Sequence, residues 1–216
     1  MELSEDIIPV TYMGGTGGSF LCHFITNAKL NDKNLIVLSV NGNTHYAVNR
    51  EIENPQQGVS KPDMDKINFI FEQDLDPTLT KPCYTNAHIT DLKLITQYFK
   101  KSIRITYDLD DVNELCNVMF GKWYVDDVLG GKIAINQTYT KSTIKLGFLG
   151  WITKFNKQDI PNMLFISWKE LFKGNIDELI NKLSTFTDIN TDNFSKESLI
   201  HWRNRTQQCI DKYSKF

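Results

Sequence analysis

The chain has 216 residues, of which 41% are hydrophobic and 23% charged, and its formal net charge is -2. These values are typical of a soluble globular protein with one core, and we treat residues 1–216 as a single domain. The near-neutral charge excludes bulk electrostatic binding to nucleic acid or to an anionic membrane. No run of about 18 apolar residues is present, so we expect no membrane span.

The N-terminus and the cysteines indicate a cytoplasmic protein. The opening residues MELSEDIIP are acidic and lack the basic and apolar regions of a secretory signal. The four cysteines are scattered along the chain, which is typical of reduced thiols. No CxxC pair and no pair of histidines has metal-ligand spacing, so we expect no metal site.

The stretch IIPVTYMGGTGGSFLCHFI, residues 7–25, predicts a strand over 8–13, a glycine loop and the start of a helix. Four glycines let successive N–H groups point into one concavity, whose natural ligand is a phosphate or sulfate. Ser19 is positioned to cap the helix or to bond the anion. The candidate binding residues are Gly14, Gly15, Thr16, Gly17, Gly18, Ser19 and Phe20. The alternative is a glycine turn that only connects the strand to the helix.

The next part of the chain alternates between apolar runs and polar segments. Its pattern predicts strands over 35–40, 44–48 and 84–88, a loop over 49–63, and helices over 64–71 and 91–101. The strand over 84–88 ends on His88, whose ordinary pKa near neutrality suits a general base. The alternative for His88 is a partly buried histidine bonded to backbone.

The second half continues the alternation. A strand over 102–107 is followed by Asp108 as the N-cap of a helix through Met119, and residues 121–141 have the composition of a flexible lid. A helix over 142–155, a strand over 162–167 and helices over 168–172, 176–186 and 195–213 complete the chain. This order predicts an α/β three-layer sandwich with a mostly parallel central sheet. Ligands bind at the carboxyl ends of such strands, where the glycine loop, His88 and Asp108 would lie.

Four segments in this order resemble the sulfotransferases that use 3′-phosphoadenosine 5′-phosphosulfate (PAPS). TYMGGTGGSFL resembles that family's loop for the 5′-phosphosulfate, and YTNAHI resembles the segment whose histidine is the general base. SIRITYDLDD resembles the strand and turn that handle the 3′-phosphate, and MLFISWKEL resembles a later segment of the family. The resemblance covers roughly residues 7–190. It implies a P-loop, sulfotransferase-like fold, PAPS as co-substrate, His88 as base, and a small-molecule or carbohydrate-type acceptor with a hydroxyl or amine.

Two cations of the family are missing at their expected places. The loop lysine falls at Gly15, and the 3′-phosphate arginine falls at Tyr107. A cation there lowers the barrier by stabilising charge on the leaving phosphate. Replacement candidates are Lys122, Lys132, Arg203 and Arg205, although the last two lie on a polar stretch typical of a solvated helix face.

These departures leave two alternatives to a sulfotransferase. The first is a non-catalytic nucleotide- or anion-binding protein on the same fold. The second is an atypical P-loop kinase, which is disfavoured because Gly18 stands where the Walker A motif has its lysine.

Overall fold

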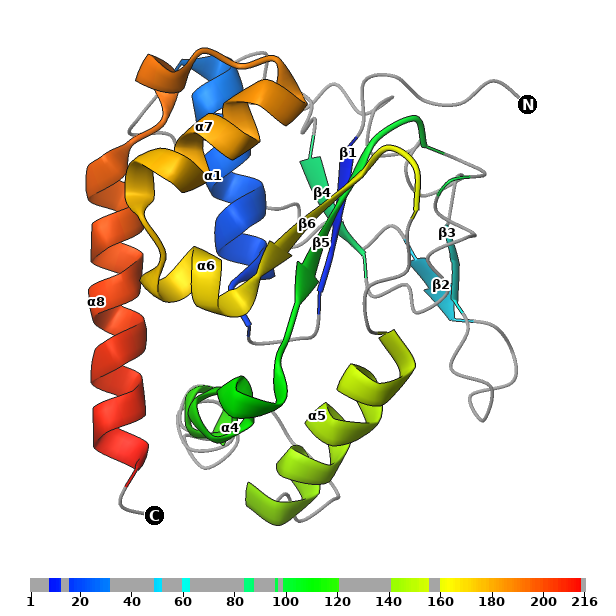
Figure 1. The fold of residues 1–216 in the computed structure, drawn as a ribbon, viewed down its shortest axis with the longest axis vertical. Coiled ribbons are helices and arrows are strands. Elements are labelled where there is room, and N and C mark those ends of the chain that lie inside the picture. Colours follow the sequence, from blue (N-terminus) through cyan, green and yellow to red (C-terminus); the bar gives the residue numbers. More distant parts are fainter. Residues whose placement is uncertain are drawn as a thin grey trace.

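The computed structural model describes residues 8–12, 16–31, 49–51, 60–62, 84–87, 96, 99–120, 141–155 and 160–214 (Figure 1). Its first elements are β1 (Ile8–Thr11), α1 (Gly18–Leu30), β2 (Asn49–Glu51), β3 (Ser60–Pro62) and β4 (Tyr84–Ala87). Then come β5 (Ser102–Thr106), the 3₁₀ turn η2 (Leu109–Asp111), α4 (Val112–Met119) and α5 (Lys141–Phe155). The last elements are β6 (Met163–Ser167), α6 (Trp168–Lys173), α7 (Ile176–Thr187), the 3₁₀ turn η4 (Thr191–Asn193) and α8 (Lys196–Tyr213).

Four strands form one sheet in the order β4-β1-β5-β6, and every neighbouring pair is parallel. β1 therefore lies inside the sheet, where Thr11 pairs with Ala87 on one side and with Arg104 on the other. The α/β class with a parallel sheet is confirmed. The strands predicted near 8–13, 84–88, 102–107 and 162–167 are confirmed with it, each within two residues of its observed ends.

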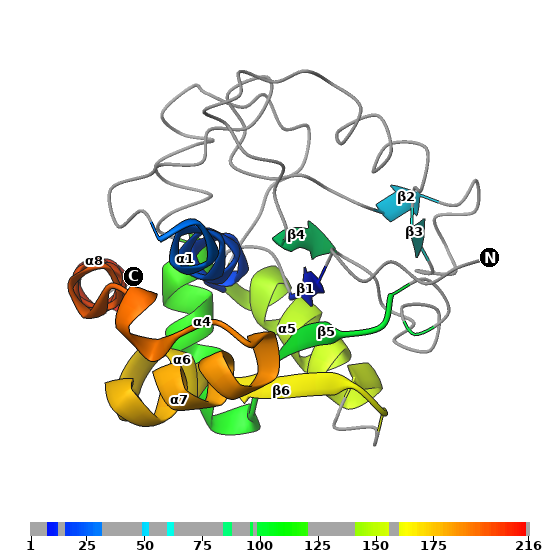
Figure 2. The same cartoon turned by 90° about the horizontal axis from the view of Figure 1, so that it is seen from above.

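The described helices lie over one face of this sheet and beyond the carboxyl ends of its strands (Figures 1 and 2). In Figures 1 and 2, α1, α6, α7 and α8 lie on the same side of the strands. α4 follows β5, and Figure 1 shows α4 and α5 beyond the carboxyl ends of the strands. A helical layer on the opposite face of the sheet is not among the described residues.

The two faces of the sheet differ in chemistry. Successive strand residues point to opposite faces, so Val10, Ile103 and Ile105 share one face, and all three are buried. The Tyr12 ring, on this same face, lies against Gly18 of α1, so this is the face that the helices cover. Thr11 and Arg104 lie on the other face and are also buried.

Capping residues mark where the C-terminal helices begin. The Ser167 side chain accepts from the backbone N–H of Glu170 at 3.0 Å, the capping arrangement of α6. Asn175 caps α7, and Ser195 caps α8 by accepting from Ser198 N–H at 3.2 Å. The helices predicted over 142–155, 168–172, 176–186 and 195–213 are confirmed within one residue at each end.

Two sequence predictions are wrong. The loop predicted over 49–63 contains β2 and β3, which pair antiparallel. The helix predicted over 91–101 does not extend over 99–101, because Phe99 makes an isolated strand-type bridge and Lys100 a bend. The strands predicted over 35–40 and 44–48, the helix over 64–71 and the proposed lid, apart from Lys141, lie outside the described residues.

Candidate functional site

The candidate loop follows β1, the strand on whose two sides the later strands of the sheet are placed. β4 lies on one side of β1, whereas β5 and β6 lie on the other. In open parallel sheets, the crevice at this switch, outside the carboxyl ends, is where ligands bind. Thr16 and Gly17 lead into α1, so the C-terminal half of the loop is at this switch point. Gly14 and Gly15 lie outside the described residues.

Gly17 sets the start of α1. It is the N-cap, with φ 92° and ψ 2°, and this end of the helix has no side-chain capping hydrogen bond. Of the two roles predicted for Ser19, that of helix cap is therefore wrong, because Ser19 is the second helical residue. Its bond to an anion stays a prediction. The backbone N–H groups of the first turn and the helix dipole are the features that favour an anion at such an end.

Both described loop glycines also have a packing role. A Cβ added to Gly17 would lie 2.5 Å from Cζ2 of Trp202, a residue of α8. A Cβ added to Gly18 would overlap the ring of Tyr12. The Trp202 ring stacks in turn on Phe20, with centroids 4.7 Å apart and planes inclined by 9°. The glycines thus allow close approach of two aromatic rings on the packed side of the loop.

A hydrogen bond ties the loop to the end of β5. Thr16 Oγ1 and the Tyr107 hydroxyl lie 2.6 Å apart, and both residues are buried. The Tyr107 ring meets the ring of Phe148 on α5 edge-on, with centroids 6.5 Å apart. Tyr107, which follows β5, therefore holds the described part of the glycine loop through its hydroxyl.

Asp108 and Asp111 follow β5 and organise its turn into α4. The backbone N–H of Asp108 donates to Asp111 Oδ2 at 3.1 Å, and Asp108 is the N-cap of η2. Burial raises the pKa of the Asp111 carboxyl, and its hydrogen bond from Asp108 opposes this. The prediction of Asp108 as the cap is confirmed for η2, which leads directly into α4.

The cation candidates are only partly described. Arg203 is not on a solvated face: it donates to the carbonyls of Leu171, Gly174 and Glu170 at 2.9, 2.7 and 3.2 Å. It therefore caps the C-terminal end of α6, and burial lowers its pKa. Arg205 is exposed on α8. Lys122 and Lys132 lie outside the described residues.

Sequence reasoning missed Arg104, in the middle of β5. It is 1% exposed, and burial lowers the pKa of its guanidinium while Tyr107 raises it. The sequence signal for it is the one charged residue within the strand Ser102–Thr106, four of whose five residues are buried. His88 also lies outside the described residues, although Ala87 before it pairs with Thr11 of β1.

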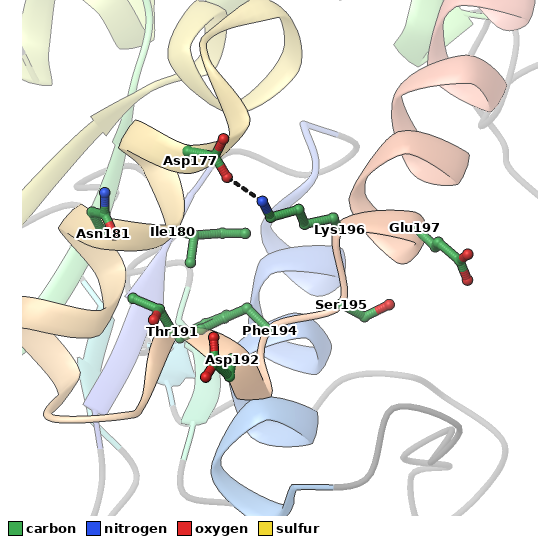
Figure 3. Close-up of a pocket in the computed structure, with 9 residues that line it drawn as sticks. All are labelled: Asp177, Ile180, Asn181, Thr191, Asp192, Phe194, Ser195, Lys196 and Glu197. Carbon is green, nitrogen blue, oxygen red and sulfur yellow. Dashed lines mark ion pairs between the residues drawn. The ribbon is translucent and has the colours of Figure 1, made fainter.

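A separate surface hollow of about 620 Å³ lies between α7, η4 and the start of α8 (Figure 3). Asp177 and Lys196 form a 2.5 Å ion pair at its rim, and Ile180 and Phe194 line it. The Phe194 ring contacts Phe24, well along α1 from its N-terminus, with centroids 5.3 Å apart. The hollow is therefore distinct from the predicted loop site.

Two further observations limit the classes of site. Within the described residues, no three His, Cys, Asp or Glu side chains are grouped so that they could hold a metal ion. None of the described helices is long and apolar enough to span a bilayer.

No known protein family matches the chain, and a search of curated proteins finds no match.

Proposed function

We propose that the loop Gly14–Phe20 binds the phosphosulfate of PAPS and that the protein transfers the sulfuryl group to a hydroxyl or amine acceptor. One observation carries the proposal: a glycine loop with a positive-φ N-cap leads from the interior strand β1 to a helix N-terminus at the sheet's switch point. The fold proposed with it is a three-layer, P-loop-like sandwich.

The proposed reaction is an in-line transfer. The bond between sulfur and the bridging oxygen of the phosphate breaks, and a bond between sulfur and the acceptor oxygen or nitrogen forms. His88 takes the acceptor's proton. The electron pair of the broken bond goes to the leaving phosphate, where the N-terminus of α1 stabilises the charge.

The second candidate is a non-catalytic nucleotide- or anion-binding protein on the same fold. Tyr107 favours it, because a buried, neutral hydroxyl bonded to Thr16 stands where the resemblance places a phosphate-binding arginine. Gly15, at the place of the family's loop lysine, points the same way. Binding without turnover would support this candidate.

Ligand-induced stabilisation tests the binding step. Thermal unfolding is followed with adenosine 3′,5′-bisphosphate, with sodium sulfate at matched ionic strength, and with ATP and Mg²⁺. We expect the bisphosphate at 100 times its Kd to stabilise the fold by about 2.7 kcal/mol. Stabilisation by ATP and Mg²⁺ alone would support the kinase alternative, and no response to any anion would refute an anion-binding loop.

Radiolabelled sulfate transfer from PAPS to a panel of sugars, alcohols and amines tests the chemistry. Transfer to any member of the panel, lost when PAPS is replaced by inorganic sulfate, would support the enzyme. Bisphosphate binding with no transfer across the panel would favour the non-catalytic candidate.

A further inference from the structure

β6 is an edge strand with no described strand on its outer side. It stands at the end of the order β4-β1-β5-β6, and in Figure 2 it is the outermost strand on its side of the sheet. Natural proteins usually protect such edges with charged residues, proline, bulges or a covering element, because the unpaired backbone groups attract another strand. β6 consists of five residues, MLFIS, with no charge and no proline. Its sequence therefore offers no protection against pairing.

The hydrogen bonds around β6 show which of its backbone groups point away from the sheet. Ser102 N–H donates to the carbonyl of Asn162 at 3.1 Å, so the backbone groups of Asn162 face β5. The N–H and C=O groups of successive strand residues point to alternate sides. The residues whose backbone groups face outward are therefore Met163, Phe165 and Ser167.

Of these three outward N–H groups, that of Phe165 is left for another strand. Met163 N–H donates to the carbonyl of Ile160 at 3.3 Å, and Ser167 N–H donates to Glu170 Oε2 at 3.4 Å. Phe165 N–H and C=O have no partner among the described residues. The Phe165 side chain is only half-buried. One position of the edge thus offers a donor, an acceptor and part of an aromatic ring.

We propose that β6 pairs antiparallel with β6 of a second copy of this chain, with Phe165 of each copy directly opposite the other. In an antiparallel pair, two opposite residues whose backbone groups point at each other exchange both N–H···O=C bonds. A twofold axis through the pair makes the contact self-complementary, because Phe165 supplies both the donor and the acceptor. The two rings then lie side by side on one face, where aromatic cross-strand pairs stabilise a sheet. This self-complementarity assigns the edge to a second copy.

The proposed contact is small, so we expect a weak dimer. Two hydrogen bonds and one aromatic pair between short strands bury less than the roughly 1,200 Å² of a standard interface. We therefore expect a dissociation constant on the order of 100 µM. β1, which leads into the glycine loop, lies two strands from this edge. The inference is therefore independent of the proposed function.

Sedimentation equilibrium of the full chain, from about 5 to 500 µM, tests the proposal. Phe165→Ala should weaken the dimer by up to about fivefold, because the ring pair is lost. Phe165→Pro should weaken it at least about tenfold further, because each copy also loses its N–H donor. Phe165→Lys places like charges opposite each other and should abolish the dimer in this range. The matched control is Leu146→Lys, which adds the same charge at a leucine of α5 that is 68% exposed and should leave the dimer unchanged.

Proline at position 165 also tests the orientation of the backbone. An edge strand accepts proline where the N–H faces away from the sheet, so urea unfolding should show Phe165→Pro to be about as stable as Phe165→Ala. Failure of Phe165→Pro alone to fold would show that this N–H is used inside the fold and would overturn the proposal. A monomer at every concentration, or a dimer that neither Phe165→Pro nor Phe165→Lys weakens, would overturn it as well. Loss of the dimer in Leu146→Lys alone would move the contact to α5 and have the same consequence.

Discussion

Gly17 provides the sharpest test of how the loop is held. Its φ of 92° lies in the region that side chains rarely adopt, and a Cβ there would lie 2.5 Å from Trp202 Cζ2. The backbone strain of Gly17→Ala is worth about 1–3 kcal/mol. Forcing a methyl group against a packed ring adds about 1–3 kcal/mol. We therefore expect urea unfolding to show a loss of about 2–6 kcal/mol, and the melting temperature to fall by roughly 4–24 °C.

A double-mutant cycle with Trp202→Phe divides this loss into its two parts. Phenylalanine keeps a ring to stack on Phe20 but lacks Cζ2 and Cη2, the two indole atoms nearest the added Cβ. In that background Gly17→Ala should cost only the backbone part, about 1–3 kcal/mol. The coupling energy between the two sites is then about 1–3 kcal/mol. An equal cost in both backgrounds would refute the packing role of Trp202, and a cost below about 1 kcal/mol in wild type would refute the backbone strain.

The cycle also decides how a binding experiment on Gly17 is read. A bulky residue such as valine would strain the backbone and strike Trp202, so loss of binding in Gly17→Val would not by itself show that the loop holds an anion. The Gly17→Ala/Trp202→Phe protein relieves the collision while keeping a side chain in the loop. Reduced bisphosphate affinity in this folded protein would support the loop as the site, whereas unchanged affinity would remove it.

Three further substitutions test separate parts of the structure. His88→Ala should lower sulfuryl-transfer turnover by roughly 100- to 10,000-fold with unchanged bisphosphate affinity. The control is His201→Ala, which replaces an exposed histidine, and equal turnover in the two variants would exclude His88 as the base. Arg203→Ala should cost about 2–4 kcal/mol in urea unfolding, because its guanidinium holds three carbonyls at the end of α6; a loss below about 1 kcal/mol would contradict that role. Burial raises the pKa of Asp111 in the folded state above its ordinary value of 3.8. Between 3.8 and this raised pKa, the unfolded chain loses the proton more readily than the folded one, so the folded state loses stability as the pH rises. Asp111→Asn should therefore gain stability relative to wild type as pH rises from 3.8 and then level off, and a difference independent of pH in a urea series would contradict this.

Local signals explain why much of the fold could be predicted. Ser167, Asn175 and Ser195 stand directly before α6, α7 and α8, and all three side chains accept backbone N–H groups of the first helical turn. β1, β5 and β6 are short runs rich in apolar residues. These features depend on neighbours in sequence, so a single sequence carries them.

The parts of the site that could not be predicted depend on distant residues. Gly17 contacts Trp202, 185 positions away, and no local pattern pairs a loop glycine with a tryptophan on a polar helix. The polar neighbours of Arg203 predict a solvated side chain, yet its guanidinium donates to carbonyls at the end of α6. The register of β1 and β5 decides that Arg104 lies beside Thr11, and strand order cannot be read from composition.

The contacts around the loop favour an anion site that is formed before the ligand arrives. Three residues from different elements hold it: Tyr12 after β1 packs on Gly18, Tyr107 after β5 bonds Thr16, and Trp202 of α8 covers Gly17. Backbone N–H groups that are fixed in this way need no reorganisation when charge develops, which is the condition under which they stabilise a transition state most. A loop held from three sides is also intolerant of side chains, so the same packing that preorganises the N–H groups excludes a lysine at Gly17 or Gly18. If the loop binds an anion as proposed, any cation for it has to come from another element.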